Sequence, residues 1–197
     1  MIFREERRFV AGSNLHLEQR EDGGGKVLKG YAAKFNIRSL LMGNFYEIIT
    51  PGAFADSLRT EDIRALYNHD DLCVLGRTSA KTLTLVEDET GLYFECFIGD
   101  RSYERDLSIS LERGDITGCS FGFIAEGETV DGESEDGYPI RRLDKIKLIE
   151  VSLGVTFPAY PDTTVALRTI KAWRDQVIAT RISKATSNRN RLKLLGL

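Results

Sequence analysis

The sequence is poor in cysteine and has no long hydrophobic segment. Its 197 residues include three cysteines, Cys73, Cys96 and Cys119. Because their number is odd and they are widely separated, they favour free thiols over a disulfide framework. No apolar run approaches the roughly 20 residues needed to cross a membrane, and the charged first eight residues lack the apolar centre of a secretion signal. We therefore expect a soluble protein made in the cytoplasm, without membrane contact.

The few cysteines also offer little for metal binding. Together with His69 they could form a zinc site of three thiolates and one imidazole. The chain has no Cys-x-x-Cys pair. Cys96 and Cys119 fall on apolar faces of expected strands, where a free thiol behaves as a small hydrophobic side chain. We therefore expect no metal and no other cofactor.

Acidic and basic residues nearly balance over the whole chain, but basic residues are concentrated at its C-terminal end. The net charge of −3 gives no general attraction to nucleic acid or to anionic membranes. From residue 168 onward, however, eight basic residues face a single acidic residue, Asp175. Apolar residues at helical spacing in this segment are Ile170, Trp173, Val177 and Ile178. With 42% hydrophobic residues the chain can build one core. We expect a β domain over residues 1–165 and a basic helical tail over residues 166–197.

Alternating apolar and polar residues predict a protein made mainly of strands. Residues 8–18 and 26–34 are expected to form an opening hairpin, and residues 81–86 and 92–98 a second one. The glycine-containing acidic segment 126–136 is expected to be a mobile loop.

Two short helices interrupt this pattern. Thr50 followed by Pro51 suits the start of a helix that continues to Leu58. Ser102 can cap a second helix, which is expected to end at Gly114.

One expected strand carries a hydroxyl between two glycines. In residues 116–125 the odd positions are mostly bulky, whereas Gly118, Ser120 and Gly122 occupy the even positions. Glycine inside a strand often marks the close approach of another backbone, so an extended peptide could bind along this face at Gly118 and Gly122. Ser120 is then a candidate nucleophile. The alternative is a tight barrel corner with an incidental serine. Cys119 has the opposite parity and is expected to face the core.

A histidine and a glutamate provide candidates for activating this serine. Of the two histidines, His16 lies in a polar stretch without companions, whereas His69 follows the expected strand 63–67 at the rim of a sheet. Histidine suits general-base catalysis near neutral pH. Glu150 lies among branched aliphatic residues in the expected strand 145–153, where a carboxylate needs a partner. If His69 is that partner, Glu150 would hold its tautomer, as in a catalytic triad. The alternative is a surface carboxylate on an open sheet face.

Three segments, in this order, resemble the prohead proteases of tailed bacteriophages, whose wider relatives include the herpesvirus assemblins. They are Asn68-His69-Asp70, Gly118-Cys119-Ser120-Phe121-Gly122-Phe123 and Glu150-Val151-Ser152-Leu153. The resemblance covers roughly residues 27–165. It also includes Leu28–Ala32, Glu47–Phe54, Gly91–Phe94 and Pro158–Tyr160. Cys119 is a departure, since this family often has methionine there.

The resemblance implies roles for several residues. His69 would be the general base and Ser120 the nucleophile of a serine endopeptidase that forms an acyl-enzyme. Glu150 would be the third member, with Asp70 and Asp144 as alternatives. The oxyanion would be stabilised by backbone N–H groups near Ser120 or by the loop containing Arg141 and Arg142, since in the herpesvirus relatives an arginine-bearing loop has this role.

The resemblance also implies a fold and a setting. The fold would be α+β and mainly β, a closed or nearly closed antiparallel barrel flanked by helices, as in assemblin. The partners would be the major capsid protein and its scaffolding segment, which the enzyme would cleave, together with itself, inside the assembling procapsid in the host cytoplasm. The herpesvirus enzymes are active as dimers, so a homodimer is an arrangement to test. Nucleic acid is not an expected partner.

Two other functions compete with this interpretation. A non-catalytic β-barrel could bind or scaffold the coat protein and retain the same segments for structural reasons. A nuclease would use the basic tail, but the residues around His69 include no plausible metal-binding cluster of carboxylates. Replacement of Ser120 by alanine separates the first alternative from a protease.

Overall fold

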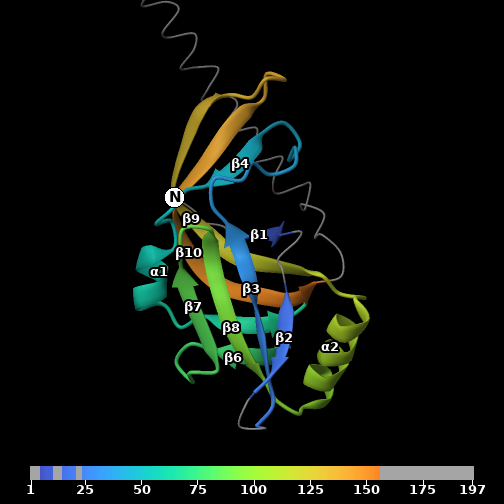
Figure 1. Cartoon of the computed structure of the whole chain (residues 1–197). Helices are drawn as coiled ribbons and strands as arrows, with labels where there is room; N and C mark the ends of the chain where they lie inside the picture. The colour runs from blue at the N-terminus through green and yellow to red at the C-terminus, as the bar shows by residue number, and fades with distance from the viewer. Residues whose placement is uncertain (1–4, 11–14, 21–23, 156–197) are drawn as a thin grey trace, which may run out of the picture. The chain divides into compact units, whose positions relative to one another are not determined.

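A computed structural model describes residues 5–10, 15–20 and 24–155 of the chain (Figure 1). All of them belong to the first of two units into which the chain divides, Met1–Ala159. The basic tail expected over residues 166–197 lies outside the described residues. The domain boundary near residue 165 therefore stays a prediction.

The described residues contain ten strands and two helices. In chain order they are β1 (Glu5–Val10), β2 (His16–Gln19), β3 (Lys26–Lys34), β4 (Tyr46–Ile49), α1 (Ala55–Thr60), β5 (Arg64–Tyr67), β6 (Asp70–Arg77), β7 (Leu83–Glu87), β8 (Gly91–Ile98), α2 (Ser102–Arg113), β9 (Gly118–Glu133) and β10 (Pro139–Val155). Neither helix is long and apolar enough to cross a membrane. The prediction of a mainly β protein with a few helices is confirmed.

The strands form two open sheets (Figure 1). The six-stranded sheet has the order β1-β9-β10-β5-β6, and β4 also pairs with β10. The four-stranded sheet has the order β2-β3-β8-β7. Among the described residues neither sheet closes on itself, so the predicted closed barrel is wrong. The predicted antiparallel arrangement is also incomplete, because β4 and β5 both run parallel to β10.

Both sheets contribute to one hydrophobic core. Leu28 of β3 and Phe94 of β8 are fully buried, as are Phe121 and Phe123 of β9. Phe121 packs edge-on against Phe54, with the ring centres 5.8 Å apart. The bulky odd positions of β9 therefore face the core, as their alternation predicts. Fixing one face of β9 in this way leaves its even positions on the opposite face.

Several predicted elements are confirmed. Strands β7 and β8 form the second hairpin. Helix α2 covers Ser102–Arg113, but its N-cap is Arg101, so the prediction that Ser102 caps it is wrong. Gly114 terminates the helix with a φ of 78°, and its N–H bonds to the carbonyl of Leu111. A left-handed residue just past a helix is a common helix stop, and glycine adopts it without strain.

Other predictions are wrong in instructive ways. Of the expected opening hairpin, only β2 pairs with β3, whereas β1 pairs with β9 in the other sheet. Helix α1 has Phe54 at its N-cap, so it does not begin at Thr50. The acidic segment 126–136 is largely not a loop, because β9 continues to Glu133 and pairs with β10 throughout.

Candidate active site

His69 lies in the two-residue turn that joins β5 to β6. Tyr67 and Asp70 pair across this turn, and Asn68 and His69 have φ values of 50° and 62°. Two consecutive left-handed residues are typical of a tight hairpin turn, which usually has glycine at its second central position. A left-handed histidine costs about 1 kcal/mol, so the surrounding contacts must hold this turn in place. Since β5 lies beside β10, the turn brings His69 to the middle of the six-stranded sheet.

Glu150 of β10 contacts the His69 ring. The distance from His69 Nδ1 to Glu150 Oε1 is 2.7 Å, and only 4% of Glu150 is exposed. The alternative of a surface carboxylate is therefore wrong. The second carboxylate oxygen, Oε2, accepts a hydrogen bond of 2.8 Å from the Ser152 hydroxyl. With the carboxylate accepting at both oxygens, His69 donates from Nδ1, which leaves the Nε2 lone pair of the neutral ring available.

Ser120 of β9 is placed opposite Ser152, on the face that carries Glu150, by the register of the sheet. It lies opposite Ser152 of β10 in an antiparallel pair, so both side chains project from the same face. The same Ser152 hydroxyl accepts the backbone N–H of His69 at 2.9 Å. Ser120 Oγ and His69 Nε2 are both buried and have no hydrogen-bond partner among the described residues. These are the two atoms between which a general base and a nucleophile exchange a proton.

The two glycines that flank Ser120 make room for neighbouring side chains. A Cβ on Gly122 would lie 2.7 Å from Glu150 Oε1, and one on Gly118 would lie 2.4 Å from the ring of Phe9. Phe9 belongs to β1 and stands opposite Ser120 in the register. Since β1 pairs with one edge of β9 and β10 with the other, an extended substrate has no free edge of β9 beside Ser120 in this structure. Substrate binding at Gly118 and Gly122 stays a prediction.

The two alternative carboxylates lie elsewhere. Asp70 accepts the backbone N–H of Leu72 within its own strand. Asp144 bonds to the hydroxyl groups of Thr50 and Thr129. Neither makes a recorded contact with the His69 ring, whereas Glu150 does. Among the three candidates the geometry therefore favours Glu150.

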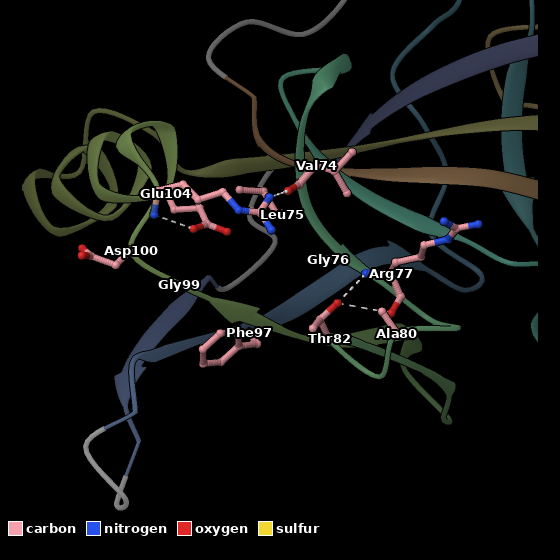
Figure 2. A pocket seen from close by; sticks show the side chains of 11 residues that line it. Val74, Leu75, Gly76, Arg77, Ala80, Thr82, Phe97, Gly99, Asp100 and Glu104 are labelled. Atoms are coloured by element: carbon pink, nitrogen blue, oxygen red, sulfur yellow. Dashed lines mark hydrogen bonds between the residues drawn. The ribbon is translucent and has the colours of Figure 1, made fainter.

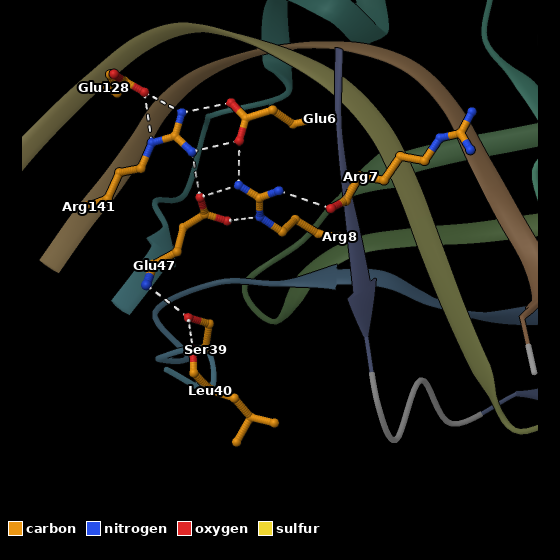
Figure 3. Close-up of polar contacts among 8 residues, drawn as sticks. All are labelled: Glu6, Arg7, Arg8, Ser39, Leu40, Glu47, Glu128 and Arg141. Carbon is orange, nitrogen blue, oxygen red and sulfur yellow. Dashed lines mark hydrogen bonds and ion pairs between the residues drawn. The ribbon is translucent and has the colours of Figure 1, made fainter. Parts of the chain in front are cut away.

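Arg141 lies in a second buried polar cluster rather than at the serine (Figure 3). Its guanidinium donates five hydrogen bonds, to Glu6, Glu47 and Glu128. Arg8 of β1 bonds to Glu47 and Glu6 in the same cluster. An arginine has five N–H groups, so none of those on Arg141 is left for an oxyanion.

The electrostatics of this cluster follow from its geometry. Burial raises the pKa of Glu6, but the hydrogen bond from Arg141 and the charges of Arg8 and Arg141 outweigh it and lower that pKa to about 2. For Arg141, burial alone would lower the pKa, but the hydrogen bonds and charge interactions with Glu6 and Glu47 raise it overall. Glu6 therefore stays negatively charged and Arg141 positively charged, and the cluster links β1, β4, β9 and β10.

Arg142 is the other predicted oxyanion residue. It lies on β10 opposite Ile48 of β4 and Thr129 of β9. It is eight positions before Glu150, which corresponds to about 26 Å along a fully extended strand. The described contacts give no support to either arginine as an oxyanion donor, so these assignments stay predictions.

A surface pocket of about 560 Å³ lies between β6, β8 and the start of α2 (Figure 2). Its walls include Arg77, Phe97, Arg101 and Glu104. None of the lining residues is His69, Ser120 or Glu150. Within the described part of the chain no group of three or more metal-binding side chains is found either. Neither feature extends the candidate site.

Sequence reasoning found three members of this site and missed Ser152. The signal for it was its spacing, because residues two apart in a strand share a face and Ser152 follows Glu150 by two positions. Serine in a strand is nevertheless common enough that spacing alone does not single it out.

Comparison with known proteins identifies a matching family model and similar solved structures. The family model of caudovirus prohead serine proteases matches residues 13–176. A similar solved structure is that of the bacteriophage T4 capsid assembly protease, gp21, with a TM-score of 0.43 and 11% sequence identity; the match covers 76% of this chain and 99% of that chain. No curated protein matches the sequence.

Proposed function

The chain belongs to the caudovirus prohead serine protease family, and on this premise we propose that Ser120 is its nucleophile, His69 its general base and Glu150 the residue that orients His69. The observation that carries the proposal is the pairing within the site. Glu150 takes the Nδ1 side of the His69 ring at 2.7 Å, while Nε2 and Ser120 Oγ are buried and have no hydrogen-bond partner among the described residues, each other included. A nucleophile and its base need this freedom.

The mechanism is acyl transfer. As Ser120 Oγ attacks the carbonyl carbon of a peptide bond, His69 Nε2 takes the hydroxyl proton and then delivers it to the departing amine. Water enters next, gives a proton to the same nitrogen and attacks the ester. This restores Ser120 and releases the second product. Throughout, Glu150 accepts the Nδ1–H bond and stabilises the positive charge that the ring acquires in each step.

The tetrahedral intermediate needs hydrogen-bond donors for its oxyanion. Backbone N–H groups near Ser120 would take this role once β1 leaves the edge of β9, because in the described pairing both edges of β9 are occupied there. Arg141 already gives its five N–H groups to carboxylates. The substrate would bind in an extended conformation along the face of β9 at Gly118, where the Phe9 ring must first leave the space in front of the backbone. At Gly122 the Glu150 carboxylate already fills that space, so the predicted contact there would be with Glu150 in place.

The proposed substrates are the scaffolding segment of the major capsid protein and the protease itself, cleaved within the assembling procapsid. The support is membership of a family of prohead proteases. Residues 1–165 would form the protease domain. The basic tail over residues 166–197 would attract an acidic scaffold partner, since eight of its residues are basic and one is acidic.

Co-expression with the major capsid protein that this chain is proposed to cleave tests the proposal. We expect intact mass spectrometry to show a shortened capsid protein with the wild-type chain and only full-length capsid protein with Ser120→Ala. His69→Ala should behave like Ser120→Ala, and the double variant should be no worse, because a triad acts as a unit.

Equal masses with wild type and Ser120→Ala, in shells that contain this protein, would refute the catalytic assignment. The chain would then be a non-catalytic capsid assembly protein. Circular dichroism of each variant provides the control, because neither substitution removes a core side chain and both variants should fold.

A further inference from the structure

We propose that Ser152 is a fourth member of the active site, a positioning residue that locks Glu150 and the His69 turn to each other. The inference rests on the proposed function of Ser120, His69 and Glu150. Ser152 is fully buried on β10, two residues after Glu150, and lies opposite Ser120 in the sheet. Its hydroxyl is thus at the centre of the three residues.

The hydrogen-bond directions at Ser152 are fixed. Its Oγ is 2.9 Å from the backbone nitrogen of His69, which can only donate. It is 2.8 Å from Glu150 Oε2, and a carboxylate can only accept. A hydroxyl has a single hydrogen, so Ser152 accepts from the main chain of His69 and donates to Glu150. No other orientation satisfies both contacts.

The first consequence concerns the carboxylate. With Oε2 held by Ser152, the other oxygen of Glu150 faces His69 Nδ1 at 2.7 Å. Without this hydroxyl the carboxylate could rotate about its last bond, and nothing else among the recorded contacts binds Oε2. Ser152 therefore selects the rotamer in which Glu150 orients the imidazole ring.

The second consequence concerns the backbone that bears the histidine. His69 has a φ of 62°, a left-handed conformation that a residue with a side chain adopts at a cost. Such a conformation persists only where the surroundings hold it. The bond from the His69 N–H to Ser152 supplies this restraint from a neighbouring strand. One hydroxyl thus fixes both the side chain and the main chain that place the base.

Steady-state kinetics of Ser152→Ala test the proposal, with a peptide spanning the cleavage site identified by intact mass. We expect kcat to fall about 10- to 100-fold, the effect of losing one hydrogen bond to a charged group. KM should change less than about twofold, since Ser152 acts on the base and not on the substrate. Ser152→Thr, which keeps the hydroxyl, should recover most of the activity.

A matched control comes from the β9–β10 hairpin. The Ser134 hydroxyl also accepts a backbone N–H, from Tyr138, and bonds to a carboxylate, that of Asp136. Ser134→Ala should therefore reproduce the loss of a buried hydroxyl without changing kcat. If Ser152→Ala retains the wild-type kcat, or if Ser134→Ala loses as much, Ser152 is not a positioning residue.

A second readout does not depend on cleavage. The Nδ1–H proton of His69, bonded to Glu150, should give a downfield proton resonance that broadens or disappears in Ser152→Ala and persists in Ser134→Ala. If Ser152→Ala fails to fold, Ser152→Cys preserves the volume with a weaker donor and should give the same result. An unchanged resonance overturns the inference. If wild type and Ser120→Ala cleave equally while the resonance responds as expected, the proposed function fails and the positioning role of Ser152 on the ring stands.

Discussion

The chain has two buried polar clusters on the same long strands, and they differ in how completely their hydrogen bonds are satisfied. Around Arg141 every N–H of the guanidinium meets a carboxylate. Around Glu150 the hydrogen bonding is incomplete, because His69 Nε2 and Ser120 Oγ have no partner among the described residues. The first cluster joins strands, whereas the second keeps two reactive atoms available.

The difference shows that burial of polar groups serves two purposes in this fold. A buried group without a partner costs about 1–3 kcal/mol, so it persists only where the rest of the structure tolerates the cost. In the Arg141 cluster such a group would be a defect. At Ser120 it is what nucleophilic catalysis requires, since a hydroxyl engaged elsewhere cannot pass its proton to a base.

The largest expected effect comes from breaking the satisfied cluster. Arg141→Ala leaves the buried Glu47, the partly buried Glu6 and the exposed Glu128 short of a cation and should lower the free energy of unfolding by about 3–5 kcal/mol. Urea denaturation at neutral pH measures this. Arg7→Ala is the matched control, because Arg7 pairs with Glu5 at the surface and should contribute less than about 1 kcal/mol. Equal losses in both variants would contradict the structural role of the cluster.

An intermediate effect is expected where a glycine makes room for Glu150, the proposed orienting carboxylate. Gly122→Ala places a Cβ 2.7 Å from Glu150 Oε1, so the carboxylate must leave its position beside His69. We expect cleavage to fall about 100-fold, or about 2.7 kcal/mol in activation free energy. Gly127→Ala on the same strand is the control, because its Cβ would meet Lys145, with the Lys145 Cβ at 3.0 Å, and no residue of the candidate site. Wild-type cleavage by Gly122→Ala would exclude the described position of Glu150 from the working site.

The smallest effect concerns the pH dependence of stability. The pKa of Glu6 is about 2 in the fold and 4.5 ordinarily. Since the folded carboxylate binds its proton more weakly than the unfolded one, it stabilises the protein above pH 4.5, and this contribution is lost as the pH falls towards 2. Glu6→Gln should remove about 2 kcal/mol of that pH-dependent stability, as measured by urea denaturation between pH 7 and 3. Glu5→Gln, at the surface, should keep the wild-type pH profile.

Much of the site could be predicted from the sequence because it lies on elements with clear alternation. The bulky and small positions around Ser120 identify a strand with two unlike faces, and the apolar run before His69 identifies a strand that ends at a turn. Glu150 among branched aliphatic residues indicates burial. Each of these patterns depends on neighbouring residues alone, and local patterns can be recognised without knowing the fold.

What could not be predicted depends on contacts between distant segments. Residues 8–18 are expected to pair with residues 26–34, but β1 (Glu5–Val10) has no alternation that specifies a partner, and it pairs with β9 in the other sheet. The charged residues of segment 126–136 suggest a loop, but strands whose side chains face water are also polar. Gly122 shows the same limit at the site, because the sequence indicates that space is needed there but not that Glu150 fills it.

The parallel pairing of β5 with β10 has a consequence for when activity can arise. His69 is separated by 81 residues from Glu150 and by 83 from Ser152. Parallel strands cannot be joined by a simple hairpin turn, and such long-range pairing forms late because a large loop must close first. While β10 has not yet emerged from the ribosome, a growing chain therefore lacks Glu150, the partner of His69. The proposed peptide hydrolysis can begin only after synthesis has passed residue 152 and the last described strand has docked.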